Sequence, residues 1–111
     1  MNFPNRVETE WESYRTDESR AVEDLLRRHF DSADAYRYNS ASLRVRIADP
    51  KFRGLSREQR DDLVEPILSE LDERTQADLM NVILLYPGEV SDSFRAHINN
   101  EEFEHPSRSN L

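Results

Sequence analysis

The chemistry most visible in this sequence is that of cationic side chains gathered in one part of an acidic chain. Guanidinium forks match the geometry of phosphate, and the positive end of a helix beginning near residue 56 would add to their field. The pattern predicts a phosphate- or nucleic-acid-binding patch, with Tyr36 and Tyr38 placed to stack on bases. The cations of this patch are Arg37, Arg44, Arg46, Lys51, Arg53, Arg57 and Arg60.

The distribution of charge offers a second interpretation of the same residues. The 111-residue chain carries a formal net charge of −8, with a net of −4 over 1–34, +5 over 35–60 and −9 over 61–111. A basic middle between acidic ends predicts that the arginines pair with acids of the same chain. We favour this pairing, and packing for the two tyrosines, because typical nucleic-acid binders are basic overall. The chain also lacks the Gly-x-x-Gly loop with which a KH domain clamps nucleic acid.

Catalytic and metal-binding chemistry finds little support. The chain has no cysteine, and its histidines, His29, His97 and His105, share no ligand spacing. Asp61 and Asp62 stand near the start of a predicted helix, where acids favour the dipole. We therefore predict no enzyme activity, no bound metal and no cofactor.

The segments that must position these cations have clear patterns. Apolar residues with helical spacing predict a helix over 18–30, with Asp17 as its N-cap. Residues 35–38 and 42–48 flank turn formers and predict a hairpin, in which Arg44 and Arg46 share the outward face, with Arg37 as a candidate to join them. A capping box of Ser56 and Gln59 begins a second helix, kinked at Pro66, whose predicted apolar face is Leu63, Val64, Ile67, Leu68 and Leu71.

A third strand is predicted over 77–86, and both of its faces are apolar. We place Leu79, Ile83 and Leu85 on one face and Met80, Val82 and Leu84 on the other. Such a strand is typically central in its sheet or paired in parallel. The fold class is therefore α+β, with the order α-β-β-α-β, a three-stranded mixed sheet and helices packed on one face.

One face of this predicted sheet has no cover within the core domain. The chain divides into a lead-in over 1–16, an α+β domain over 17–90 and a tail over 91–111, which we expect to form a short helix and then to be disordered. A second copy of the chain would also serve as cover, but we favour the tail, chiefly residues 90–104. The candidate side chains are Trp11, Tyr14, Phe94 and Ile98.

The element order and the residues around 52–64 resemble the BolA family, whose fold is related to class II KH domains. The family carries a phenylalanine, a glycine two residues on, a serine four on, an Arg-His-Arg triplet eight to ten on and a valine twelve on. The matching positions here are Phe52, Gly54, Ser56, Arg60 and Val64, and Tyr86-Pro87-Gly88-Glu89 is similar to the end of the family's third strand. The resemblance covers about residues 18–90.

The resemblance also bears on function through positions that differ. In the family, a histidine at the start of strand three helps to hold a two-iron, two-sulfur cluster shared with a monothiol glutaredoxin. That position falls on or near Leu79, the triplet's histidine and second arginine fall on Asp61 and Asp62, and the turn over 39–42 contains neither cysteine nor histidine. The resemblance therefore implies a non-enzymatic interaction or regulatory module that has lost cluster ligation.

These observations also predict where the protein is located and what it binds. The N-terminus lacks the apolar run of a signal peptide, and no apolar window approaches the length of a membrane span, so we expect a soluble, cytoplasmic protein without a membrane partner. A protein partner is expected, with a monothiol glutaredoxin as the one that the resemblance implies. A KH-like nucleic-acid-binding protein using the cations of 37–60 is the alternative function, and a homodimer remains open.

Overall fold

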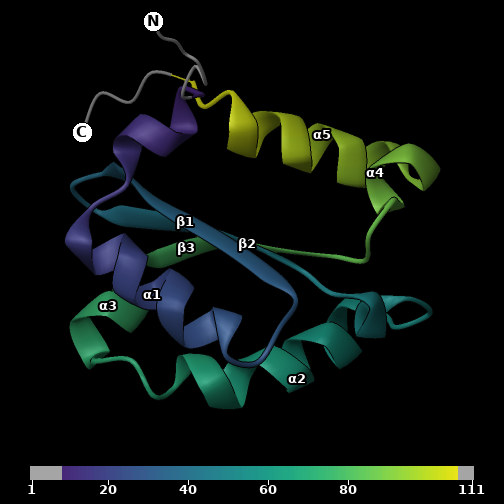
Figure 1. The fold of residues 1–111 in the computed structure, drawn as a ribbon, viewed down its shortest axis with the longest axis horizontal. Helices are drawn as coiled ribbons and strands as arrows, with labels where there is room; N and C mark the ends of the chain where they lie inside the picture. The colour runs from purple at the N-terminus through teal and green to yellow at the C-terminus, as the bar shows by residue number, and fades with distance from the viewer. Residues whose placement is uncertain (1–8, 108–111) are drawn as a thin grey trace, which may run out of the picture.

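The computed structural model describes residues 9–107, and the first eight and last four residues lie outside the described part, including those ends of the lead-in and the tail. The chain folds as an α+β unit in which a mixed three-stranded sheet lies between two helical layers (Figure 1). The elements in order are η1 (Trp11–Tyr14), α1 (Asp17–Arg27), β1 (Ser32–Asn39), β2 (Ser42–Ala48), η2 (Pro50–Phe52), α2 (Arg57–Leu68), α3 (Glu73–Asp78), β3 (Leu79–Leu85), α4 (Glu89–Asp92) and α5 (Phe94–Glu104), where η marks a 3-10 helix. Within 9–107 no helix is both long and apolar enough to cross a membrane.

The sheet has the order β1-β2-β3, so β2 is the central strand. β1 and β2 form the predicted antiparallel hairpin, with Ala35 opposite Val45, and β3 runs parallel to β2, with Val45 opposite Val82. The expected parallel pairing of the third strand is therefore confirmed. β3 lies at the edge of the sheet, not at its centre. Both of its faces are nevertheless apolar, because a helical layer covers each side of the sheet.

The helices α1 and α2, which form the lower layer in Figure 1, each begin with a capping box. At α2 the Ser56 hydroxyl accepts from the Gln59 N–H at 3.2 Å, while the Gln59 side chain accepts from the Ser56 N–H at 2.9 Å, as predicted. At α1 the N-cap is Thr16, whose hydroxyl accepts from the Ser19 N–H at 3.1 Å. The prediction of Asp17 as the cap was wrong by one residue, because the serine three residues on completes a box with Thr16.

The lower core lies between the sheet and the helices α1 and α2. It joins Val22 and Leu26 of α1, Val45 and Ile47 of β2 and Val64 of α2, all at most 2% exposed. Ala33 and Ala35 on β1 are small, so α1 can lie close against that strand. Ile67, Leu68 and Leu71 pack against this core as expected, but Leu63 is 42% exposed and does not belong to the buried face.

The upper core lies on the other face of the sheet, and the side chains that cover that face come from segments outside 17–90. Its buried members are Trp11, Tyr36, Ile83, Leu85, Ala96 and Phe103, contributed by η1, β1, β3 and α5. The chain's own tail and lead-in are therefore the cover, as favoured from the sequence. The expected contacts of Phe94 and Ile98 were wrong, because both point outward from α5. Tyr14 lies at the margin of this core, 39% exposed, with its ring centroid 6.1 Å from that of Tyr36.

A bulge at the start of β3 corrects the predicted faces of that strand. The register steps from Leu43 opposite Leu79 to Arg44 opposite Asn81, which leaves Met80 without a partner in the ladder. Leu79 consequently packs on the lower core, and Met80 is 69% exposed instead of sharing a face with Val82. The residues before the bulge form the short helix α3, so the strand begins at Leu79 and not at residue 77.

Candidate functional site

Arg37 faces α1, on the opposite side of the sheet from Arg44 and Arg46. Its guanidinium donates to Glu18 of α1 at 2.6 Å and to Asp78 of α3 at 2.8 Å. The hydrogen bonds to Glu18 and then Asp78 raise the pKa of Arg37 above its usual value. The expectation that Arg37 joins the other two arginines was wrong, because neighbouring residues of a strand alternate between faces and Arg37 is opposite Leu43.

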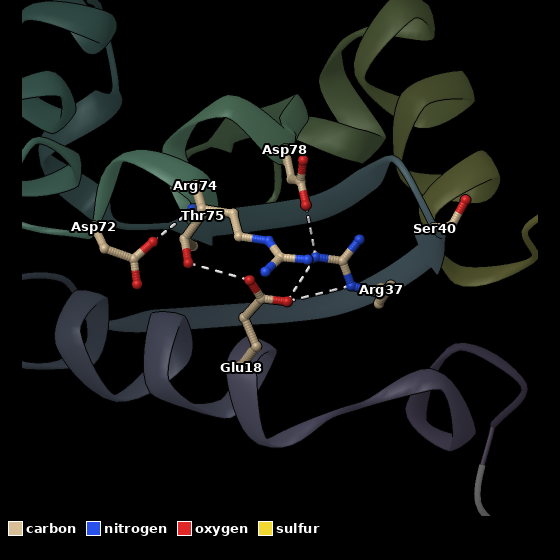
Figure 2. Close-up of a pocket in the computed structure, with 7 residues that line it drawn as sticks. All are labelled: Glu18, Arg37, Ser40, Asp72, Arg74, Thr75 and Asp78. Atoms are coloured by element: carbon tan, nitrogen blue, oxygen red, sulfur yellow. Dashed lines mark hydrogen bonds and ion pairs between the residues drawn. The ribbon is translucent and has the colours of Figure 1, made fainter.

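A polar cleft of about 410 Å³ surrounds this ion pair (Figure 2). Within it, the Thr75 hydroxyl donates to Glu18 at 3.1 Å, and the Thr75 N–H donates to Asp72 at 2.7 Å, which caps α3. That backbone hydrogen bond holds the pKa of the Asp72 carboxyl below its usual range. The cleft thus joins α1, β1 and α3 through groups that satisfy one another.

Arg44 and Arg46 lie on the upper face of the sheet, beneath α5. Arg44 stacks over the Tyr38 ring at 3.8 Å and donates to the backbone oxygen of Glu102 at 3.3 Å. Arg46 binds Asp34 of β1 at 2.7 Å and Glu104 of α5 at 2.6 Å. Both arginines therefore connect the sheet to the tail helix, within the same chain.

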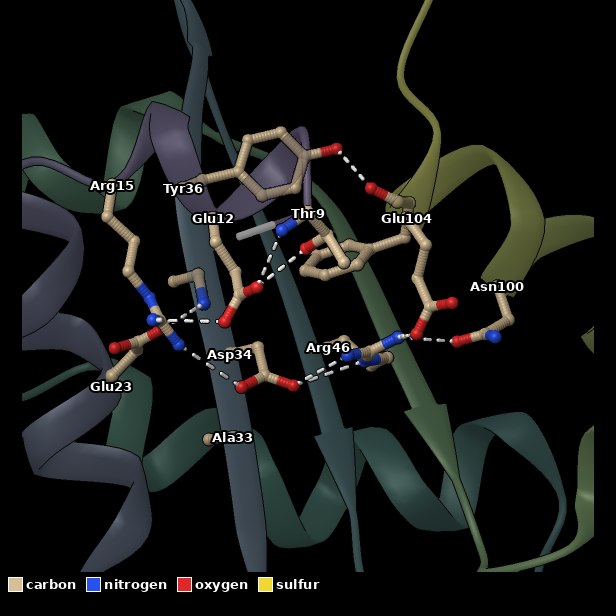
Figure 3. Close-up of polar contacts among 12 residues, drawn as sticks. Thr9, Glu12, Arg15, Glu23, Ala33, Asp34, Tyr36, Arg46, Asn100 and Glu104 are labelled. Atoms are coloured by element: carbon tan, nitrogen blue, oxygen red, sulfur yellow. Dashed lines mark hydrogen bonds and ion pairs between the residues drawn. The ribbon is translucent and has the colours of Figure 1, made fainter. Parts of the chain in front are cut away.

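Arg46 belongs to a row of alternating charges that crosses the upper face (Figure 3). From the lead-in, Arg15 lies 3.0 Å from Glu23 and 3.7 Å from Asp34, and Asp34 then meets Arg46. The guanidinium of Arg15 lies 4.8 Å from the Trp11 ring centroid. The row joins η1, α1, β1, β2 and α5, so it fastens both terminal segments to the sheet.

Tyr36 forms the aromatic centre of the same face. Its hydroxyl donates to the backbone oxygen of Phe103 at 2.8 Å, and the two rings meet edge to face at 4.8 Å. Burial raises the pKa of Tyr36, although the nearby Arg44 acts in the opposite direction. The tyrosine is thus a packing residue of the upper core, which agrees with the interpretation favoured from the sequence.

Arg57 and Arg60 reach from α2 to the outer edge of β3. Arg57 donates to the Val82 oxygen and Arg60 to the Leu84 oxygen, each at 2.9 Å. Arg60 also pairs with Glu89 at 2.7 Å. These two arginines therefore cap outward-facing carbonyls of an edge strand.

Lys51 and Arg53 are exposed, as is Arg57, whereas the other four cations are partly or fully buried. Lys51 donates to the His29 oxygen at 3.2 Å, and Arg53 stacks over the Tyr86 ring at 4.4 Å. The structure thus divides the seven predicted cations among the lower face, the upper face, the edge of β3 and the loop before α2. It does not bring them together as one patch.

The residues that carry the family resemblance each have a role in the fold. Phe52 is fully buried and Val64 nearly so, both in the lower core, and Ser56 caps α2. Gly54 has φ +80°, a conformation that a side chain disfavours. Arg60 caps the edge of β3 as described above. Each motif residue within 52–64 therefore has a role in the fold around the start of α2.

The turn of the hairpin and the start of β3 form a cleft of about 340 Å³. The exposed Met80 is one of its lining residues, and the uncharged Ala41 and Ser42 come from the turn and the first position of β2. None of the lining side chains is a histidine, a cysteine or a carboxylate, the usual ligands of metals. The lining residues are Tyr38, Asn39, Ala41, Ser42, Arg44, Met80 and Asn81.

Among residues 9–107, one group of metal-ligand types comes together at the end of α5. The ligand atoms of Glu101, Glu104 and His105 lie within 4.8 Å of one another. Glu104, however, already pairs with Arg46 at 2.6 Å. His29 and His97 are not members of this group.

Comparison with protein-family models, with curated proteins and with solved structures finds no match to this chain.

Proposed function

We propose that this chain is a non-enzymatic protein-interaction module, similar to BolA proteins but without iron–sulfur cluster ligation. The observation that carries the proposal is the cleft between the hairpin turn and the start of β3. There, the exposed large hydrophobic side chain is Met80, which the bulge leaves out of the ladder at 69% exposure. A flexible methionine beside neutral polar groups and the cationic Arg44 suits a protein surface and offers iron no strong ligand.

The element order and the motif positions support the family part of the proposal. The α-β-β-α-β order that the resemblance implies is present, with the short helix α3 added before β3, and the start of β3 and the hairpin turn lie side by side at this cleft. Position 79 is a leucine packed on the lower core, and its neighbour Met80 takes the exposed place. The partner would accordingly be held by side-chain packing and backbone contacts.

Nucleic-acid binding is the second candidate, and the surface that remains for it is small. Lys51, Arg53 and Arg57 are the exposed members of the predicted set, all near the start of α2. Arg57 is itself engaged with Asp61 at 3.0 Å. A binder that relies on phosphate contacts would need more free cations than these, so we place protein binding first.

The proposal is tested by capture of partners with matched variants. Immobilised full-length chain is compared with Met80→Asp and with Leu63→Asp, which places the same charge on an exposed position of α2. We expect a specific partner to be lost by Met80→Asp and kept by Leu63→Asp. Capture that is unchanged by Met80→Asp would contradict the proposal.

The cluster part is tested with a monothiol glutaredoxin loaded with a two-iron, two-sulfur cluster. Mixing it with this chain is expected to give no new visible absorption bands, whether or not the two proteins bind. A coloured heterodimer whose spectrum depends on a residue of this chain would overturn the absence of ligation.

A further inference from the structure

The outward face of α5 carries an apolar pair that no described element covers. Phe94 is 81% exposed and Ile98 is 48% exposed, and residues four apart lie on the same side of a helix. Figure 1 shows α5 as the outer layer above the sheet, with its inner side turned toward the strands. The inner side is filled by Ala96 and Phe103, so the exposed pair contributes nothing to the cores of the monomer.

The charged residues on either side of this pair would be complementary if two copies of α5 packed antiparallel. Arg95 stands three residues before Ile98, and Glu101 and Glu102 stand three and four residues after it; all three are exposed. Arg95 and Glu102 are seven residues apart, so they lie on the same flank of the helix. If a second α5 is placed antiparallel with Ile98 near the two-fold axis, each Arg95 lies beside Glu102 of the other copy.

The edges of the sheet offer a second copy no comparable route. On β3, Arg57 and Arg60 already occupy the outward carbonyls of Val82 and Leu84. Two side chains of α1 act likewise on β1, which discourages pairing of strands between copies. These contacts are Arg27 Nε to the Ala33 oxygen at 2.9 Å and the Ala35 N–H to Glu23 at 2.8 Å.

We propose that the outward face of α5 is a self-association surface, on which two copies of this chain pair antiparallel through Phe94 and Ile98. The contact is isologous, with the apolar pair at its centre and two equivalent Arg95–Glu102 ion pairs at its rim. One helix face buries less surface than a standard interface does, and the net charge of −8 on each copy opposes association. The dimer is therefore weak, and screening of the net charge by salt partly offsets this repulsion.

This surface is distinct from the partner surface proposed above. Met80 lies at the start of β3, whereas α5 follows the end of that strand after α4. The two proposals therefore stand or fall independently. Loss of partner capture by Met80→Asp leaves the self-association test unaffected, and the reverse also holds.

The first test is sedimentation velocity of the full chain over about 10–500 μM. We expect a reversible shift from monomer toward dimer, with a dissociation constant on the order of 100 μM. Phe94→Ser should weaken the dimer at least about tenfold, whereas Leu63→Ser, an exposed leucine on α2, should leave it unchanged. A monomer throughout this range, or a dimer unaffected by Phe94→Ser, would overturn the proposal.

The second test exchanges charges and so specifies the orientation of the two helices. Arg95→Glu alone and Glu102→Arg alone should each weaken self-association. An equimolar mixture of these two variants should form a heterodimer more tightly than either variant pairs with itself, because opposite charges meet on both sides of the heterodimer, whereas each variant paired with itself brings like charges together on both sides. All substitutions are at exposed positions, and circular dichroism verifies that each variant is folded. No preference for the heterodimer would exclude the antiparallel pairing.

Discussion

Arg46 and Asp34 form a 2.7 Å ion pair across the β1–β2 ladder, at directly opposed positions of the two strands. The same guanidinium reaches Glu104 on α5 and lies 4.6 Å from the Phe103 ring centroid. One side chain thus joins the two strands to a helix that is 58 residues further along the chain. This member of the predicted phosphate-binding set is therefore a structural connection between the sheet and the tail.

Replacement of Arg46 by alanine is expected to lower the free energy of unfolding by about 2–3 kcal/mol. The side chain is only 14% exposed, and its loss leaves Asp34 with a weaker set of partners in a largely covered site. Chemical denaturation monitored by circular dichroism measures the change. Arg20→Ala, at an exposed position of α1, is the matched control and should change stability by less than about 0.5 kcal/mol.

Truncation to alanine should affect stability very differently at the two phenylalanines of α5. Phe103 is 1% exposed within the upper core, so Phe103→Ala is expected to cost about 3–5 kcal/mol and to expose surface that binds an apolar dye. Phe94→Ala, at low protein concentration, should leave the free energy of unfolding nearly unchanged. Equal effects of the two substitutions would show that α5 does not pack on the sheet as described.

The local patterns of this sequence predicted most of the core domain. Alternation of Leu43, Val45 and Ile47 with arginines indicated a strand with one face turned to the lower core, and the Ser56 capping box marked the start of α2. The position of Met80 could not be predicted, because a bulge shifts the faces of β3 without any proline or glycine to mark it. The extent of α5 was underestimated, since polar residues separate Phe103 from the apolar residues at the start of that helix.

The charge pattern predicted that arginines meet the chain's own acids, but not which acids. Arg37 with Asp78 and Arg46 with Glu104 are pairs more than 40 residues apart, brought together only by the fold. Arg15 was overlooked as a member of the row because its segment had little helical pattern. The spacing of Arg15 from Trp11 was the available signal, because four residues along a helical segment place a cation near an aromatic face.

Stability at high pH should depend on Tyr36. Burial raises its pKa in the folded state, so the proton is held more tightly there than in the unfolded chain. A group with a raised pKa contributes stability that is fully present below its unfolded value of about 10 and is lost as pH rises through the folded value. Unfolding free energies of the wild type and of Tyr36→Phe, measured between about pH 8 and 12, isolate this contribution.

At pH 8 the wild type should be more stable than Tyr36→Phe by about 0.5–1.5 kcal/mol, because the variant leaves the Phe103 oxygen without its donor. The difference should shrink above pH 10 as ionisation of Tyr36 destabilises the wild type. A difference that stays constant up to pH 12 would contradict a tyrosine held neutral by burial.

Nucleic acid should bind this chain only weakly. Four of the seven predicted cations, Arg37, Arg44, Arg46 and Arg60, are partly or fully buried and engaged with groups of the same chain, and the net charge of −8 repels phosphate. We expect dissociation constants weaker than about 1 μM for generic RNA and DNA at about 150 mM salt, measured by fluorescence anisotropy.

The exposed cations provide the decisive variant. Lys51→Glu with Arg53→Glu removes the two that lie in and just after η2, whereas Arg20→Glu with Arg28→Glu makes the same charge change at exposed positions in α1 and at its C-cap. Weak binding that responds equally to both double variants is the expected result, since only the net charge then matters. Tight binding that falls steeply with salt and is abolished by the first double variant alone would make nucleic acid the better assignment, because released counterions would then report specific phosphate contacts at those two positions.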